Sequence, residues 1–165
     1  MHTCFYLICP TDCLEQTINK TFKHESYFYT SLGNSFEYDH KTIEYIKKII
    51  EKHNIKNICF VLSINNTIVL DALINNNFSN IRGLHNFYTE IKKQKEHLKV
   101  AFKSDKLQFT LLSYYLNRKI KELRLQLMHA SNQPIKINGK IFNKTESVFT
   151  TIYSDLVCLE KHQLN

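Results

Sequence analysis

The sequence predicts an α/β fold with a central, mainly parallel β-sheet flanked by helices. Short apolar runs alternate with helical segments in the order strand, turn, helix, which is typical of parallel strands joined by crossover helices. The run Ile58–Leu62 is apolar at every position, as expected for a strand buried on both faces. Near the end of the chain, alternation of apolar and polar residues predicts an antiparallel edge strand or hairpin. With 165 residues, the sequence is expected to form one domain over residues 1–165.

The N-terminal part predicts two strands with a short helix between them. The first strand, Phe5–Cys9, is closed by Pro10, because proline cannot donate to a central ladder. A short helix is expected over Asp12–Thr21. The aromatic segment Ser26–Thr30 predicts the second strand, which is stopped by the turn signal Gly33-Asn34.

The middle of the chain predicts helix, strand and helix. Asp39 suits the N-cap of a helix whose isoleucines recur at helical spacing, and Asn54 suits a left-handed stop. The buried strand Ile58–Leu62 follows. The segment Ser63–Asn66 can then cap a helix over Thr67–Ile74.

The remainder predicts two helices and a hairpin after an Asn-rich irregular stretch. The helices are expected over His85–His97 and Lys106–Met128, and the hairpin strands over Ile135–Phe142 and Val148–Ile152. Five apolar residues of the second helix repeat in register and are expected in the core: Leu112, Leu116, Ile120, Leu123 and Leu127.

Composition excludes some classes of protein without naming an activity. Hydrophobic residues are 43% and charged residues 22%, which is a globular rather than a disordered composition. No apolar run approaches the ~20 residues needed to cross a bilayer. The net charge of +7 makes this a basic protein that can attract polyanions, but the basic residues are spread along three helical segments, so we do not expect nucleic acid as a partner. No export signal is recognised before Pro10, and five cysteines at irregular spacing fit a reducing compartment, so we expect a cytoplasmic location.

Four segments share their order and spacing with one known family. They are Leu7-Ile8-Cys9, Tyr29-Thr30-Ser31-Leu32-Gly33-Asn34, the strand and turn over residues 55–66, and Ile137-Asn138-Gly139-Lys140-Ile141-Phe142. In this order they resemble the β-class carbonic anhydrases. That family ends its first strand in Cys-x-Asp-x-Arg, continues with Arg-Asn-Ala-Gly-Asn, and follows a buried strand with Gly-His-x-x-Cys. Cys9, Gly33 and Asn34 agree with these signature residues.

The resemblance implies a degenerate member that lacks most of the zinc ligands. The family's three ligands fall on Cys9, Ser63 and Asn66, of which only Cys9 can supply a strong zinc donor. Its Asp and Arg fall on Thr11 and Cys13, since Asp12 is one residue out of register. Without zinc, a bound water loses the effect that lowers its pKa to about 7. The resemblance therefore implies that CO2 hydratase activity is lost and that no zinc cofactor is bound.

The expected function is that of a binding or interaction protein, a pseudoenzyme that retains the family fold. The vestigial family pocket would comprise Cys9, Thr11, Cys13, Ser31, Gly33, Asn34, Ser63 and Asn66. A small anion or metabolite could bind where a helix begins after a parallel strand, since such crevices bind ligands and free N–H groups favour anions. A homodimer is the other partner hypothesis. The alternative function is an active zinc lyase, a carbonate dehydratase with rearranged ligands.

Several residues also have simpler interpretations. Cys9 suits a small buried residue at a strand end, and Ser63 and Asn66 suit helix caps alone. Cys9 and Cys13 could instead hold a metal with a histidine such as His24 or His85. Ser63 follows a strand as a hydrolase nucleophile does, but it lacks the flanking glycines of that motif.

Overall fold

The computed structural model describes residues 3–101, 107–128 and 134–153. Five strands form one sheet: β1 (Thr3–Ile8), β2 (Glu25–Thr30), β3 (Asn57–Ser63), β4 (Lys136–Asn143) and β5 (Val148–Thr151). The strand order is β2-β1-β3-β4-β5. The pairs β1·β2, β1·β3 and β3·β4 are parallel, and β4·β5 is antiparallel. The predicted fold class, with its antiparallel C-terminal edge, is confirmed.

The helices follow the strands closely in the chain. They are α1 (Glu15–Thr21), α2 (His40–Lys52), α3 (Thr67–Ile74), α4 (His85–Ala101) and α5 (Leu107–Leu127). Asp39 is the N-cap of α2, as predicted, and its carboxylate accepts a hydrogen bond from Thr42 N. The first helix was predicted to begin at Asp12 but begins at Glu15. Residues Pro10–Asp12 instead form a 3-10 turn that ends where Cys13 takes a left-handed conformation, with φ of 51°.

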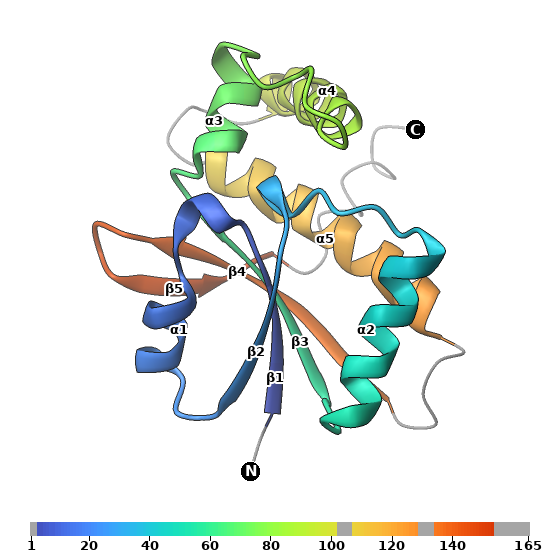
Figure 1. Cartoon of the computed structure of the whole chain (residues 1–165). Coiled ribbons are helices and arrows are strands. Elements are labelled where there is room, and N and C mark those ends of the chain that lie inside the picture. Colours follow the sequence, from blue (N-terminus) through green and yellow to red (C-terminus); the bar gives the residue numbers. More distant parts are fainter. Residues whose placement is uncertain (1–2, 102–106, 129–133, 154–165) are drawn as a thin grey trace, which may run out of the picture.

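The sheet separates two hydrophobic layers. Helices α2 and α5 pack on one face together with α3 and α4, and α1 packs on the other face (Figure 1). The predicted apolar stripe of α5 lies in the larger layer, and Leu112, Leu116 and Leu123 are fully buried. None of the helices in the described ranges is long and apolar enough to span a membrane.

The strands β1 and β3 lie side by side at the centre of the sheet, with Ile8 opposite Val61. Because they are parallel, the segments that follow them emerge at the same edge. Helix α3 begins just beyond this edge (Figure 1). Central, adjacent carboxyl ends are where open α/β sheets place their ligand sites, so the fold directs attention to the residues after Ile8 and Val61.

Candidate functional site

The candidate site is the crevice formed where β1 and β3 end. Cys9 follows β1, Ser63 is the last residue of β3, and Asn66 is the N-cap of α3. A 3-10 turn, Leu32–Asn34, follows β2 and reaches this place from the neighbouring strand. Its side-chain amide at Asn34 donates to Val61 O at 2.9 Å, which ties the turn to β3.

Cys9 is the most enclosed member of the crevice, with a fully buried side chain. Its Sγ accepts the backbone N–H of Gly33 at 3.1 Å and lies 3.0 Å from Thr11 Oγ1. The thiol is therefore held by neighbours on two sides. Gly33 has φ of +60°, and a Cβ at this position would come within 2.9 Å of the Phe87 ring, so glycine allows both this backbone conformation and the close approach of Phe87.

The orientation of Asn66 is fixed by the helix that it caps. Its Oδ1 accepts the backbone N–H groups of Ile68 at 3.1 Å and Val69 at 3.0 Å. Since oxygen must face these two donors, the NH2 group faces the crevice. That group donates to Asp12 Oδ1 at 2.9 Å and approaches Thr11 Oγ1 at 3.4 Å. Asn66 thus presents hydrogens, and no lone pair, to the crevice.

Asp12 supplies the negative charge of the crevice. While Oδ1 accepts from Asn66, Oδ2 accepts the backbone N–H of Ser63 at 2.8 Å. Burial raises the pKa of this carboxyl above its ordinary value of 3.8, and the two hydrogen bonds oppose that shift. The carboxylate bridges the end of β3 and the beginning of α3, where an external anion would otherwise find its donors.

Most of the predicted pocket residues gather here. Cys9, Thr11, Gly33 and Asn66 are joined by the contacts above, and Asn34, next to Gly33, is buried and bonded to Val61 O. Two predicted residues have other surroundings. The Cys13 side chain is exposed, with Sγ 3.4 Å from Pro10 O, and Ser31 Oγ accepts from Phe36 N.

Ser63 is also part of the crevice, through its backbone. Its N–H donates to Asp12, and the residue is 9% exposed. Among the described contacts, none joins the Ser63 hydroxyl to a base, which a hydrolase nucleophile would need. The structure therefore offers no support for the hydrolase interpretation.

The side chains at the three family ligand positions do not fit the zinc ion of the β-class carbonic anhydrases. Zinc in proteins takes thiolate, imidazole or carboxylate ligands, with three of them in a catalytic site. Of the three family positions, Cys9 alone provides such a donor, and Asn66 turns its NH2 toward the crevice. Within the described ranges, no three His, Cys, Asp or Glu side chains are grouped closely enough to hold a metal.

The rearranged metal site with a histidine also finds no support. His24 lies on the α1 side of the sheet, where its Nε2 pairs with Tyr6 OH at 2.9 Å and its ring stacks on that tyrosine. His85 begins α4 and is exposed. Cys13 is exposed as well, so these groups do not converge on Cys9 in the part of the chain that the structure describes.

Sequence reasoning missed two residues of the site. Asp12 was set aside because its position is out of register with the family motif, yet its carboxylate lies at the centre of the crevice. Tyr115 of α5 is fully buried, and its hydroxyl donates to Gly33 O at 2.9 Å and Asn34 O at 3.0 Å. A signal for Tyr115 existed, since it lies three residues after Leu112 on the face predicted to be buried.

Comparison with known proteins adds the fold relationship. No family model matches the sequence, and no curated protein matches it. The structure is similar to the β-carbonic anhydrase CafD of Aspergillus fumigatus, with a TM-score of 0.72, 14% identity, and coverage of 93% of this chain and 90% of that one. CafA of the same fungus gives 0.69 and 14% identity over 98% and 80%. A tetrameric β-carbonic anhydrase of Sordaria macrospora gives 0.65 and 14% identity over 91% and 79%.

These similarities extend over nearly the whole chain and show that it has the β-carbonic anhydrase fold. The fold inferred from four short segments is therefore confirmed. At this level of identity the similarity carries the fold alone, so the activity has to be argued from the crevice.

Proposed function

We propose that this chain is a binding protein built on the β-carbonic anhydrase fold, which holds no zinc at the family position and does not hydrate CO2. The observation that carries the proposal is the hydrogen bonding of Asn66. Its oxygen is used by the first N–H groups of α3, and its NH2 group faces Asp12. A residue at a ligand position that turns N–H groups toward the metal would repel it.

The hydrogen bonds of Asp12 also argue against a zinc ion in the crevice. A carboxylate can ligate zinc, but both oxygens of Asp12 already accept hydrogen bonds, from Ser63 N and Asn66 Nδ2. Turning Asp12 toward Cys9 would leave the buried Ser63 N–H without a partner, which costs about 1–3 kcal/mol. Cys9 and Asp12 would then be two negatively charged ligands, and a catalytic zinc site needs three protein ligands.

Hydration of CO2 by the family route requires a zinc ion held by three such ligands. A zinc ion would supply hydroxide at neutral pH by lowering the pKa of its bound water. The crevice residues themselves are an enclosed thiol, a hydroxyl, an amide and a carboxylate bonded to the amide. The carboxylate holds its neighbours in place, so it is not directed at a substrate water.

The hydrogen bonds of the crevice oppose the binding of a small anion there. The donors that would receive it are used by Asp12 and Asn66. An anion would have to displace a carboxylate of the chain itself. We therefore propose that binding takes place elsewhere on the molecule. The proposal includes self-association as a homo-oligomer, which is supported by the tetrameric solved structure of the same fold.

A reducing, cytosolic setting belongs to the proposal as well. The four cysteines that the structure describes are free thiols, and three of them, Cys4, Cys9 and Cys59, are buried. Burial raises the pKa of the Cys4 thiol to about 11, which keeps it protonated and unreactive at neutral pH.

The test measures the rate of CO2 hydration in a stopped-flow instrument with a pH indicator, once with added zinc and once without it. The chain should give no rate above the buffer, with or without zinc. A matched variant carries Ser63→His and Asn66→Cys, which restores two family ligands beside Cys9, and it should gain zinc binding. Hydration by the unmodified chain that disappears with a chelator and with Cys9→Ser would overturn the proposal in favour of the zinc lyase.

A further inference from the structure

Strand β2 forms one edge of the sheet, next to β1 and with no strand on its other side among the described residues. In Figure 1, α1 lies on one side of β2 and α2 on the other. The six residues of β2 pair with β1 in an unbroken register, from Thr3 opposite Glu25 to Ile8 opposite Thr30. The strand contains no lysine, proline or bulge, which are features that commonly protect an edge strand from pairing with another chain.

The outer edge of β2 presents backbone groups that have no partner. Just beyond the strand, Ser31 N donates to Ile8 O of β1 at 3.0 Å. Because successive residues of a strand direct their N–H and C=O groups to opposite sides, Ser26, Phe28 and Thr30 direct theirs away from β1. Within the described ranges, no residue bonds to these outward groups. An edge of this kind can accept a further strand through main-chain hydrogen bonds.

The side chains of β2 follow almost the same order in both directions along the chain. The segment Ser26-Tyr27-Phe28-Tyr29-Thr30 has a phenylalanine at its centre, a tyrosine on each side and a small hydroxyl residue at each end. Two copies placed antiparallel, with Phe28 opposite Phe28, would pair Tyr27 with Tyr29 and Ser26 with Thr30. Aromatic pairs and Ser–Thr pairs on facing strands stabilise antiparallel sheets. The sequence of the strand is therefore complementary to itself.

The backbone permits this register. With Phe28 opposite Phe28 and Ser26 opposite Thr30, residues whose N–H and C=O groups point outward face one another, so every outward donor meets an acceptor. A shift by one residue would place outward-pointing residues opposite inward-pointing ones. Glu25, the charged residue of the strand, would lie opposite Ser31, so no like charges would meet.

The opposite edge of the sheet lacks these features. Strand β5 has four residues, Val148–Thr151, and their order is not the same in both directions. Short edge strands resist pairing with another chain. The two edges of the sheet therefore differ, and β2 is the one suited to self-pairing.

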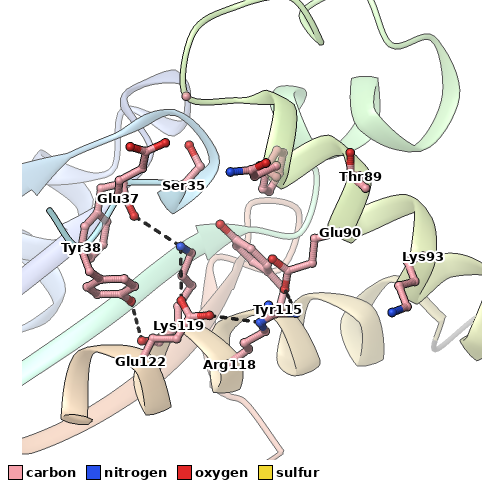
Figure 2. Close-up of a pocket in the computed structure, with 14 residues that line it drawn as sticks. Ser35, Glu37, Tyr38, Thr89, Glu90, Lys93, Tyr115, Arg118, Lys119 and Glu122 are labelled. Carbon is pink, nitrogen blue, oxygen red and sulfur yellow. Dashed lines mark hydrogen bonds and ion pairs between the residues drawn. The ribbon is translucent and has the colours of Figure 1, made fainter. Parts of the chain in front are cut away.

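A cavity of about 550 Å³ between the segment 35–38, α4 and α5 is the other candidate for a binding surface. Figure 2 shows that its charged side chains come from all three of these segments. Arg118 pairs with Glu90 at 3.4 Å and with Glu122 at 3.1 Å, and Lys119 pairs with Glu122 at 3.6 Å. These charges neutralise one another within the wall, whereas the outward groups of β2 are left without partners.

From these observations we infer that two copies of this chain associate through β2, with the two strands antiparallel and Phe28 at the two-fold axis. Each sheet would continue into the other, and both copies of α1 would lie on the same face. A two-fold contact uses the same surface of both copies, so it closes as a dimer. The inference rests on the self-association part of the proposed function and names its interface.

The first measurement is sedimentation equilibrium of the full chain at about 1–100 μM, where the unmodified chain should form dimers. The disrupting variant carries Ser26→Lys and Thr30→Lys. Because each of these positions faces the other across the inferred contact, the variant would place two lysines opposite two lysines. Like charges directly opposite destabilise paired strands, so the dissociation constant of the dimer should rise about tenfold or more.

A second variant tests the register. Ser26→Glu with Thr30→Lys places opposite charges across the same contact, so its dissociation constant should stay within about threefold of that of the unmodified chain. This compensation requires that position 26 of one copy faces position 30 of the other. Far-UV circular dichroism and urea denaturation of all variants show whether each is folded.

The matched control adds the same charge at the other edge of the sheet. Val148→Lys with Thr150→Lys changes two exposed residues of β5 and should dimerise like the unmodified chain. If the control weakens the dimer as much as the two lysines on β2 do, the effect is one of net charge and the inference is wrong.

Three further outcomes would overturn the inference. A chain that is monomeric up to about 100 μM would also refute the self-association part of the proposed function. A dimer that tolerates both lysines on β2, or that is weakened equally by the lysine pair and the glutamate–lysine pair, would refute this interface or its register and leave self-association standing. None of these outcomes bears on zinc or CO2, so the loss of catalysis is tested separately.

Discussion

The carboxylate of Asp12 accepts a hydrogen bond from the side-chain amide of Asn66, with 2.9 Å between Oδ1 and Nδ2. The contact joins the turn after β1 to the first residue before α3, which are 54 positions apart in the chain. It occupies the crevice where the resemblance would place a ligand of zinc. The relationship can be tested through stability, because each partner has a second hydrogen-bonding role.

Asn66→Ala should lower the free energy of unfolding by about 1–3 kcal/mol. The change removes an N-cap and leaves one oxygen of Asp12 without its donor, and each loss costs of the order of 1 kcal/mol. Urea denaturation measures the effect. The control is Asn65→Ala, an exposed neighbour outside the helix cap, which should change stability by less than about 0.5 kcal/mol. Equal effects of the two variants would contradict the capping role.

Asp12 should make stability depend on pH in a predictable direction. Because burial raises the pKa of this carboxyl above 3.8, the folded chain holds its proton more tightly than the unfolded chain does. Its contribution is therefore fully present below pH 3.8 and is lost as the pH rises through the raised value.

The variant Asp12→Asn isolates this effect, since it cannot titrate at that position. The stability of the unmodified chain relative to the variant should fall as the pH increases above 3.8, and should then level off. Urea denaturation of both proteins at a series of pH values gives the difference. A difference that rises over this window would mean that hydrogen bonding, and not burial, dominates the pKa.

Tyr115→Phe should destabilise the chain by about 1–3 kcal/mol, because the change leaves two buried carbonyl groups, of Gly33 and Asn34, without the hydroxyl. The matched control is Tyr45→Phe, since Tyr45 is 54% exposed and its hydroxyl has no described partner. Thermal unfolding followed by circular dichroism measures both. A midpoint for Tyr115→Phe equal to that of the control would show that the turn does not depend on this hydroxyl.

Gly33→Ala and Gly83→Ala separate backbone strain from crowding. Both glycines have positive φ, +60° and +88°, so both substitutions strain the backbone. At Gly33 the new Cβ would also come within 2.9 Å of the Phe87 ring, whereas at Gly83 no atom lies within 4 Å. Gly33→Ala should therefore cost about 1–3 kcal/mol more by urea denaturation, in the range of overpacking. Equal costs would remove the argument that Phe87 requires glycine.

Much of the fold could be predicted because its signals are local. The all-apolar run of β3 and the capping residues Asp39 and Asn66 identify their elements without tertiary information. The predicted start of α1 was wrong. Pro10 favours a helical turn locally, and the left-handed conformation of Cys13 ends that turn before α1 begins.

The crevice could be predicted only in part. Alignment with a family motif brings Cys9 and Asn66 to one place, because both follow central parallel strands. It could not find Asp12, whose side chain enters the crevice through a turn geometry that the motif does not share. The cavity between the segment 35–38, α4 and α5 was not predicted at all. Its charged residues Glu37, Lys93 and Arg118 come from three separate segments and share no local pattern.

The most direct test of the central claim is the metal content of the untagged protein, measured by inductively coupled plasma mass spectrometry after dialysis against zinc and then against metal-free buffer. We predict far less than one zinc per chain for the unmodified protein, and a stoichiometry approaching one for the variant with Ser63→His and Asn66→Cys. One zinc per unmodified chain that is lost with Cys9→Ser would contradict the account, because the crevice would then hold a metal despite the orientation of Asn66.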